Sequence, residues 1–277
     1  MKIEYSKFKF LTKNKYNIDF SKILKLITKA GTICLNYQKN IKNIKFEYKS
    51  KNDIVTEADK KVEYFIISNI LKLYPTHSFF GEETKNKFLS DSEFLWIIDP
   101  IDGTNSFLHN QIHYGISLAL QYKNEMIFGC VYSPRLTDMY FSVKKFGSFK
   151  NNIRIQVSST KKLENSALST GFAASIRGDN PDYTVIDVYK KILNHIRSIR
   201  QYGTAALHLC YTAEGILDGF WEKNLNIYDI AAGSLILQEA GGKVTDYKNK
   251  NNYTKEKEIV GTNSYIHKEL LSQLKNS

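Results

Sequence analysis

Cysteine is scarce in this 277-residue chain, which has only Cys34, Cys130 and Cys210. They are odd in number, far apart and set among apolar or small residues, so the sequence predicts neither a disulfide framework nor a zinc site. No apolar run reaches the roughly 18 residues of a membrane-spanning helix, and the first residues lack the apolar stretch of a secretory signal. We therefore expect a cytoplasmic protein with no membrane partner.

The chain also lacks an internal repeat and a long low-complexity linker. Its length lies near the upper limit for one continuous core, which favours two sub-domains that share a cleft. We expect an N-terminal α+β sub-domain at residues 18–157 and a smaller C-terminal α/β sub-domain at residues 158–277. Residues 1–17 show no clear period and are predicted to be an extension of uncertain order.

Acidic residues are fewer than basic ones, 28 against 39, and the formal net charge is +11. A basic surface attracts polyanions without specificity. The lysines are scattered among many Asn and Ile residues, and no RNA-recognition motif accompanies them. A solvated lysine-rich surface is therefore the favoured interpretation, and a role in binding RNA or a nucleic-acid machine stays open as the alternative.

Hydrophobic periodicity predicts both helices and strands. Apolar residues recur at helical spacing over residues 20–37, and a second helix is expected near Thr56, an N-cap candidate that Asp59 follows at capping-box spacing. Apolar strands are predicted at residues 94–98, 115–121, 127–132 and 138–143. The last three are joined by short turns, which favours an antiparallel sheet. Further helices are expected at residues 183–197, 204–214 and 229–240.

The most informative segment is the end of the first of these strands, which runs into Asp99, Pro100 and Asp102. Two carboxylates three residues apart provide hard oxygen donors, and a bound divalent cation would relieve their repulsion. Pro100 stiffens the turn, Gly103 allows a close backbone approach and Thr104 adds a hydroxyl. The structural alternative is a capped turn in which both aspartates accept backbone N–H groups.

Two further acidic segments favour the metal interpretation. Glu82 and Glu83 follow Gly81 at the expected end of another strand. Asp229 lies just before or within the first turn of a predicted amphipathic helix, where by itself it is an N-cap or a charge that complements the helix dipole. Each signal is weak alone, so the functional hypothesis depends on the three segments coming together.

In order, spacing and surrounding sequence, these segments resemble the inositol monophosphatase family, in particular its bacterial inositol-1-monophosphatase branch. The motifs are Asp53–Asp59, Gly81–Glu83, Trp96–Thr104 and Asp229–Gly233, and the resemblance runs from about residue 18 to the C-terminus. It implies a layered αβαβα sandwich of the α+β or α/β class, with a metal site in the cleft between two sub-domains. It also implies a homodimer and a lithium-sensitive phosphatase.

The resemblance further implies two or three Mg²⁺ ions in each active site. The first would be held by Glu82, Asp99 and the backbone carbonyl of Ile101, and the second by Asp99, Asp102 and Asp229. Mg²⁺ prefers such oxygen donors and is completed by water and substrate phosphate. The family binds a further, weaker ion near the position of Lys49, which is here either a site lysine or a solvated charge.

By the same resemblance, the reaction is hydrolysis of a small phosphorylated polyol by metal-activated water, with no covalent phospho-enzyme. Glu82 and Thr104 would orient or deprotonate that water, with Thr104 held through Asp59. The backbone around Gly103 and Thr104 would cradle the phosphate. The residues implied on the substrate side are Asp102, Gly103, Thr104, Gly203, Ala205, Glu222 and Asp229.

The substrate itself is less sharply indicated. The chain departs from the family pattern on the polyol side of the site, at Asn226, at Tyr228 and at the pair Asn105-Ser106. Phosphatases for histidinol phosphate, fructose-1,6-bisphosphate and adenosine 3',5'-bisphosphate share the metal constellation, so they remain alternatives. The short interval from Asp53 to Glu82 and the segment Phe220–Glu222 favour inositol-1-phosphate.

Overall fold

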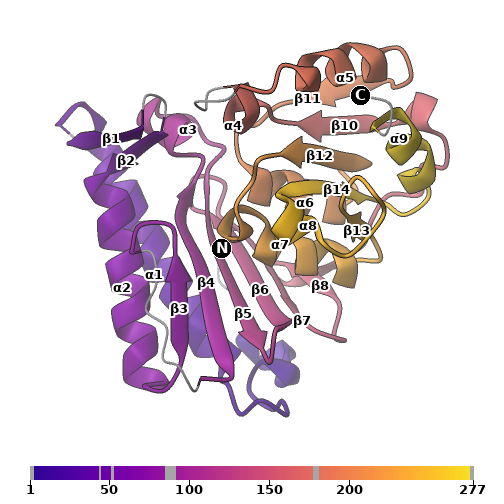
Figure 1. Cartoon of the computed structure of the whole chain (residues 1–277). Coiled ribbons are helices and arrows are strands. Elements are labelled where there is room, and N and C mark those ends of the chain that lie inside the picture. Colours follow the sequence, from indigo (N-terminus) through magenta and orange to yellow (C-terminus); the bar gives the residue numbers. More distant parts are fainter. Residues whose placement is uncertain (1–2, 44, 51–52, 85–91, 177–180, 275–277) are drawn as a thin grey trace.

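A computed structural model describes residues 3–43, 45–50, 53–84, 92–176 and 181–274. The two larger β-sheets and three layers of helices alternate in the order helix, sheet, helix, sheet, helix (Figure 1). This is the layered αβαβα sandwich that the sequence predicted.

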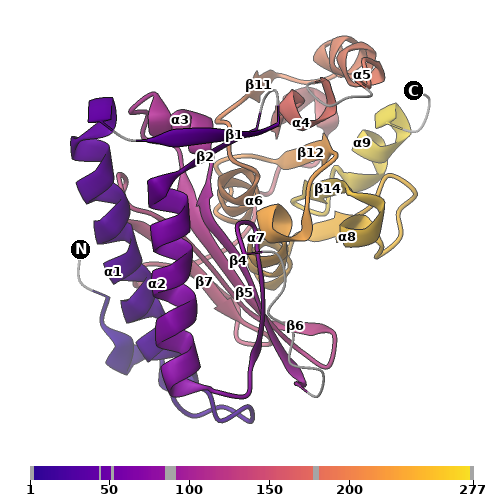
Figure 2. The ribbon, with the colours of Figure 1, turned by 60° about the vertical axis from the view of Figure 1, so that its left-hand side comes forward.

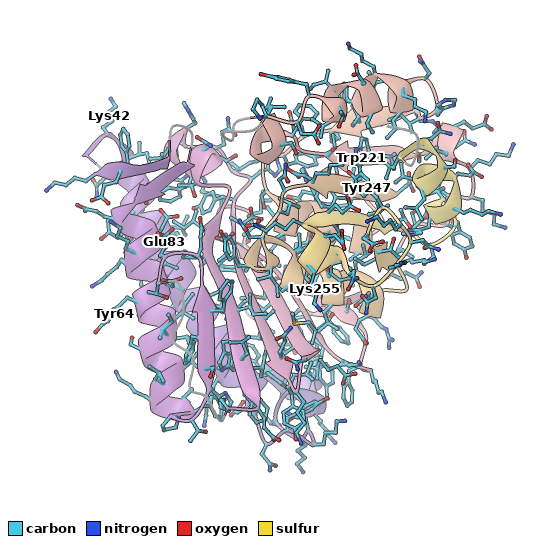
Figure 3. All side chains as sticks on the ribbon, viewed as in Figure 1. Lys42, Tyr64, Glu83, Trp221, Tyr247 and Lys255 are labelled. Atoms are coloured by element: carbon cyan, nitrogen blue, oxygen red, sulfur yellow. The ribbon has the colours of Figure 1, made fainter. Side chains whose placement is uncertain are left out.

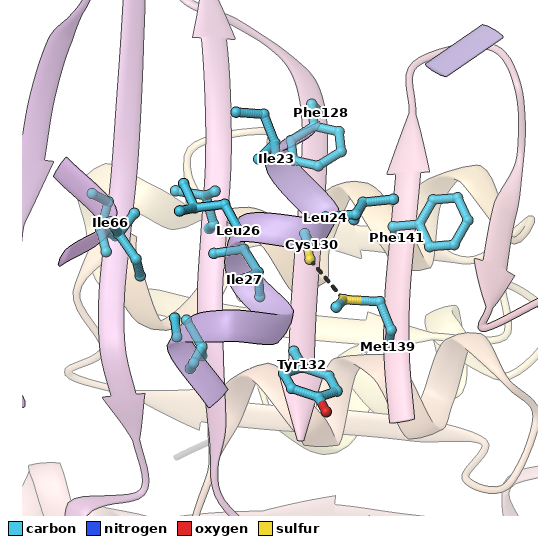
Figure 4. Close-up of a cluster of buried hydrophobic side chains, with 14 of the residues drawn as sticks. Ile23, Leu24, Leu26, Ile27, Ile66, Phe128, Cys130, Tyr132, Met139 and Phe141 are labelled. Atoms are coloured by element: carbon cyan, nitrogen blue, oxygen red, sulfur yellow. Dashed lines mark hydrogen bonds between the residues drawn. The ribbon is translucent and has the colours of Figure 1, made fainter. Parts of the chain in front are cut away.

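The first layer consists of α1 (Phe20–Lys39) and α2 (Glu57–Leu73), which lie side by side over the larger sheet (Figure 2). The buried stripe of α1, which includes Ile23 and Ile27, packs against strand residues such as Phe128 (Figure 4). α2 starts after Thr56, whose side chain forms a capping box with Asp59 and satisfies free amides of the first turn. Both predicted helices are confirmed.

The larger sheet contains, among the described residues, seven strands in the order β3 to β9. Their bounds are β3 Ser78–Gly81, β4 Phe94–Asp102, β5 Gly115–Tyr122, β6 Glu125–Ser133, β7 Asp138–Val143, β8 Ser148–Lys150 and β9 Ile153–Ile155. β5, β6 and β7 pair antiparallel, as predicted. β3 and β4 instead run parallel, which brings their C-terminal ends to the same edge of the sheet.

The middle layer lies between the two sheets and consists of α6 (Ala205–Ala213) and α7 (Ile227–Glu239) (Figure 1). All of α6 is buried, and so is α7 from Ile230 to Leu237. The prediction that α7 is amphipathic was therefore wrong. A helix covered by sheets on both sides has no solvent face that would need polar residues.

The smaller sheet has the strand order β11, β10, β12, β14, β13 within the described chain. Its strands are β10 Ala167–Thr170, β11 Ser198–Arg200, β12 Gly219–Lys223, β13 Lys243–Thr245 and β14 Glu258–Thr262. α5 (Thr184–Leu193) and α9 (His267–Leu274) form the outer layer, where Leu168, Ile192 and Leu270 are buried together. The remaining elements are β1 Phe46–Ser50, β2 Asp53–Thr56, α3 Thr104–Leu108, α4 Ala173–Ile176 and α8 Tyr253–Glu256.

Residues 3–17 pack against the larger sheet, whereas the sequence predicted an extension of uncertain order. They include two short 3-10 helices, Tyr5–Lys7 and Lys9–Leu11. Phe8 and Leu11 are buried, and the Phe8 ring meets Phe141 and Phe149 edge-on, with ring centroids 5.3 and 4.9 Å away. A segment that buries isolated side chains without a regular helix or strand leaves no periodic signal in the sequence.

Truncation of Phe8 to alanine is expected to lower the free energy of unfolding by about 3 kcal/mol, because it removes a buried ring and leaves a cavity. Urea unfolding followed by circular dichroism measures this change. The exposed Lys9 of the same segment provides the control, since Lys9→Ala should alter stability by less than about 0.5 kcal/mol. An unchanged unfolding midpoint for Phe8→Ala would mean that the segment does not pack on the sheet.

The three cysteines are buried free thiols, and Cys130 Sγ lies 3.2 Å from Met139 Sδ between the larger sheet and α1 (Figure 4). None of the helices in the described part of the chain is long and apolar enough to cross a bilayer.

Candidate active site

Two neighbouring strand ends bring three acidic residues together. β4 ends with Asp99 and Asp102, and the parallel β3 leads directly into Glu82. The backbone N–H of Glu82 donates to the carbonyl of Ile98 at 3.1 Å, so Glu82 lies beside Asp99. The register of β4 shifts between the two aspartates, and Asp99 Oδ1 accepts the N–H of Ile101 at 3.0 Å. The capped turn and the acidic cluster are thus both present.

A fourth carboxylate comes from the C-terminal half of the chain. Asn226 is the N-cap of α7, and Asp229 in the first turn accepts the Asn226 N–H through Oδ2 at 2.6 Å. Of the two roles that the sequence left open, Asp229 has the first-turn position and is not the N-cap. Its carboxyl group lies near enough to Asp99 and Asp102 for the charges to act on one another. α7 therefore brings Asp229 to the end of β4 across 130 residues of sequence.

The three aspartates of this cluster raise one another's pKa values. Burial raises the pKa of Asp99 well above its usual range, and the charges of Glu82, Asp102 and Asp229 raise it further. Burial also raises the pKa of Asp102 to about 6 and that of Asp229 well above its usual range. Desolvation and like charge both disfavour the ionised form. Among the ion pairs of the described residues, none includes Asp99, Asp102 or Asp229.

The chemistry of this donor set fits a divalent cation, because Mg²⁺ takes carboxylate oxygens and would offset their repulsion. Within the described chain, no three His, Cys, Asp or Glu side chains already meet as a metal shell. Backbone carbonyls, water and substrate phosphate would have to complete the coordination, as is common for Mg²⁺. The carbonyl of Ile101, a predicted ligand, accepts the Thr104 hydroxyl at 3.1 Å in this structure.

The structure brings together the predicted pair Thr104 and Asp59. The hydroxyl of Thr104, the first residue of α3, lies 3.3 Å from Asp59 Oδ1 as well as near Ile101, and its single hydrogen can serve one acceptor at a time. Asp59 Oδ2 accepts the Thr56 N–H at 2.9 Å and also the Thr56 hydroxyl. Burial is the main cause that raises the pKa of Asp59 to about 7. Thr56, which the sequence identified only as a helix cap, thus orients Asp59.

Gly103 allows a close backbone contact at the start of α3. Its φ is +94°, in the left-handed region that glycine adopts readily. A Cβ atom at Gly103 would lie 3.1 Å from the carbonyl oxygen of Gly203. Gly203, a predicted substrate-side residue, therefore lies against Gly103.

Thr204, which lies between the predicted residues Gly203 and Ala205, has a side-chain contact that the sequence reasoning did not predict. It is the N-cap of α6, and its hydroxyl donates to Asp102 Oδ2, which also accepts the Ala206 N–H at 2.7 Å. The two halves of the chain are thereby joined at a predicted metal ligand. A threonine before an apolar helix is a recognisable N-cap signal. Nothing in the local sequence connects that cap to Asp102.

Glu222 of β12, the predicted acid on the substrate side, is buried close to the cluster. Burial raises its pKa well above the usual range, and the charges of Asp229 and Asp102 add to this. Its carboxylate lies against Gly171, where a Cβ would be 2.4 Å from Oε1. The sequence reasoning did not single out Gly171, because a glycine that makes room for a distant side chain has no local signature.

The departures from the family pattern are also placed by the structure. Asn226 Nδ2 donates to the Tyr228 hydroxyl at 2.8 Å, so two of them form one hydrogen-bonded pair at the start of α7. Ser106 is buried in α3 and Asn105 is exposed. The side chains of Lys49 and Asp53 lie outside the described part of the structure, and the question of a site lysine stays open.

Comparison with known proteins gives a consistent assignment. Residues 19–277 match the model of the inositol monophosphatase family. An inositol-1-monophosphatase of Rhizobium meliloti is 34% identical over 248 residues, covering 90% of this chain and 92% of the relative. A Nus factor SuhB of Haemophilus influenzae is 35% identical over 247 residues, covering 89% and 92%. The crystal structure of the extragenic suppressor protein suhB from Bartonella henselae has a TM-score of 0.89 and 33% identity, covering 93% of this chain and 98% of that one. The chain belongs to the inositol monophosphatase family.

Proposed function

We propose that the protein hydrolyses a small phosphate monoester with Mg²⁺ and prefers inositol-1-phosphate. The observation that carries this proposal is the convergence of Glu82, Asp99, Asp102 and Asp229 from three separate elements on one strongly acidic edge. Membership of the family supports phosphatase chemistry. A cation site needs a cluster of mutually repelling carboxylates, whereas a purely structural role does not.

Two sets of ligands are proposed for two Mg²⁺ ions. One ion would be held by Glu82, Asp99 and the carbonyl of Ile101. The other would be held by Asp99, Asp102 and Asp229. A third, weaker ion is also compatible with the proposal. When bound, the ions would supply Lewis-acid activation of water and positive charge opposite the phosphoryl oxygens. The negative charge of the cluster would then be balanced within the site.

The protein's own hydroxyl and carboxyl groups are proposed to orient the attacking water. While the Thr104 hydroxyl donates to Asp59, its oxygen keeps lone pairs that can accept a hydrogen from water. Glu82 would accept the second hydrogen of the same water. The backbone at Gly103 and Thr104 would hold the phosphate with N–H groups.

The polyol side of the substrate is proposed to meet Glu222, Gly203 and Ala205. A buried carboxylate accepts hydrogens from substrate hydroxyls and is left unpaired by an apolar alcohol, which favours a polyol phosphate. The hydrogen-bonded pair Asn226 and Tyr228 lies at the start of the helix that carries Asp229. If this protein prefers a different substrate from the family, we expect these two residues to be the cause.

Phosphate release from four substrates tests the proposal: inositol-1-phosphate, histidinol phosphate, fructose-1,6-bisphosphate and adenosine 3',5'-bisphosphate, each with Mg²⁺ and with EDTA. We expect turnover only with Mg²⁺ and the highest kcat/KM on inositol-1-phosphate. A different best substrate would leave the mechanism in place and reassign the specificity. No release from any of the four would contradict the enzymatic proposal.

The proposal extends to a cytoplasmic homodimer that lithium inhibits, as the resemblance to the family implies. Light scattering after size exclusion tests the dimer, and a LiCl titration of Mg²⁺-dependent turnover tests the inhibition. A monomer, or turnover that LiCl leaves unchanged, would contradict the respective part.

A second candidate function is a non-enzymatic role in contacting RNA or a nucleic-acid machine. It is favoured by a relative named Nus factor SuhB that is 35% identical, against 34% for a named inositol-1-monophosphatase, and by the net charge of +11. Binding through phosphates weakens steeply as salt rises. Retention on an immobilised RNA column near physiological salt would support this role, and elution below it would exclude simple RNA binding.

A further inference from the structure

The first two turns of α2 carry two buried carboxylates on one face. Asp59 and Glu63 are four residues apart, which places them one above the other on the helix, and both are fully shielded from solvent. Asp59 meets Thr104, as described above. Glu63 points instead to the end of β3, and neither the sequence motifs nor the proposed mechanism assigns it a role.

Glu63 holds the backbone immediately after Glu82. Its Oε1 accepts the N–H of Glu83 at 3.1 Å, and Glu83 lies beside α2 (Figure 3). On the other side, the N–H of Glu82 donates to the carbonyl of Ile98, also at 3.1 Å. The two peptide groups that flank the Cα of Glu82 are therefore both anchored. This fixes the direction in which the Glu82 side chain leaves the backbone.

Gly81 makes room for the carboxylate of Glu63. A Cβ at Gly81 would lie 1.9 Å from Glu63 Oε1, far closer than a carbon and a non-bonded oxygen can approach. The φ of Gly81 is not in the left-handed region, so the glycine is required by space and not by backbone conformation. Gly81 and Glu63 thus form a matched pair.

Stability alone gives a poor reason for Glu63. The Thr84 side chain interacts with its carboxylate, yet Oε2 is buried with no hydrogen-bond partner among the described residues. Burying a carboxylate with an unpartnered oxygen costs free energy. An apolar residue would fill a helix position facing a sheet at lower cost.

We propose that Glu63 is a positioning residue of the active site, whose carboxylate aims Glu82 at the cation by accepting the N–H of Glu83. This inference rests on the proposed function, in which Glu82 is a Mg²⁺ ligand. Outer groups that orient a ligand commonly change metal affinity by 10- to 100-fold when they are removed.

The test compares Glu63→Ala with Glu63→Gln in the full-length protein. Mg²⁺ affinity is measured by calorimetry and by the Mg²⁺-dependent rise in Tm, and kcat and KM are measured on inositol-1-phosphate. We expect Glu63→Ala to weaken Mg²⁺ binding by about 10-fold and to lower kcat more than it raises KM. Glu63→Gln should keep Mg²⁺ affinity and kcat within about threefold of the wild-type values, because its amide oxygen can accept the same N–H.

Gly81→Ala tests the same contact without removing the carboxylate. The added methyl group should displace the Glu63 carboxylate and reproduce the loss of Mg²⁺ affinity seen with Glu63→Ala. In the double variant the second change should add little, because the two act through one contact. If Glu63→Ala fails to fold, Gly81→Ala carries the test.

A buried polar change far from the site is the matched control. Thr245→Val in β13 of the smaller sheet removes a hydrogen bond of 3.0 Å to His267 of α9 and should lower Tm without changing Mg²⁺ affinity. The inference is overturned if Glu63→Ala lowers Tm as the control does but keeps wild-type Mg²⁺ affinity and kcat. If the wild type binds Mg²⁺ in a Glu63-dependent way but releases no phosphate, the proposed function fails and the positioning role stands.

Discussion

Replacing Asp102 with asparagine is expected to lower kcat/KM for inositol-1-phosphate by at least about 1000-fold while the fold stays intact. Asp102 is proposed both as a Mg²⁺ ligand and as a substrate contact, and a neutral amide is a much weaker partner for a hard cation. The same amide can still accept the N–H of Ala206 and the hydroxyl of Thr204 through its oxygen. Phosphate release with saturating Mg²⁺, together with far-UV circular dichroism, separates the two effects.

Asp218 provides a control for this variant. It is about as buried as Asp102, at 7% against 8% exposed, and accepts the Ser158 hydroxyl through Oδ1 and the Ala167 N–H through Oδ2 at 2.7 Å. It precedes β12 at the end opposite Glu222. Asp218→Asn should therefore keep kcat/KM within about threefold. An active Asp102→Asn enzyme would count heavily against the proposed mechanism.

Replacing Asp99 with asparagine is expected to stabilise the metal-free protein, and increasingly so as pH rises. Burial and the charges of Glu82, Asp102 and Asp229 raise the pKa of Asp99 above its usual value in the folded state. Between the unfolded and folded pKa values, the folded state binds more protons, so wild-type stability falls as pH rises through this window. Asparagine removes one of these charges and relieves its neighbours.

The sign and size of this effect follow from proton linkage. For one group the stability difference grows by at most about 1.4 kcal/mol per pH unit. We expect the stability of Asp99→Asn relative to the wild type to increase from pH 5 to pH 8, measured by urea unfolding in EDTA. With excess Mg²⁺ the order should reverse, because only the wild type keeps the full ligand set. Phosphate release by Asp99→Asn should be lost at every pH.

The control is Phe8→Ala, which removes no ionisable group, so its stability difference from the wild type should be nearly constant over the same pH range. If the stability difference between Asp99→Asn and the wild type is also constant, the pKa of Asp99 is not raised in the folded state. In that case the acidic edge would not be under the repulsion that a cation is proposed to relieve.

Some features of the site could be predicted from the sequence because they depend on residues that are close together along the chain. The capping box of Thr56 and Asp59 needs a spacing of three residues, and it is present at the start of α2. The pair Asp99 and Asp102 ends a continuous apolar strand, as predicted. The contact between Thr104 and Asp59 was expected from the family resemblance, and the two side chains meet.

Other features depend on how elements far apart in the sequence pack. The parallel pairing of β3 with β4 puts Glu82 beside Asp99, and periodicity cannot reveal a pairing partner. The hydroxyl of Thr204 reaches Asp102 across 102 residues of sequence. The match between Gly81 and Glu63 is a matter of space between a strand and a helix.

The sequence by itself determined the family, the order of the acidic motifs and the main helices and strands, because local spacing and periodicity report directly on these. Only the tertiary structure decided that α7 is buried on both sides, that residues 3–17 join the core, that Thr204 contacts Asp102, and that Glu63 contacts the backbone after Glu82. Burial and hydrogen bonding between distant segments depend on packing in three dimensions, which a pattern along one chain does not encode locally.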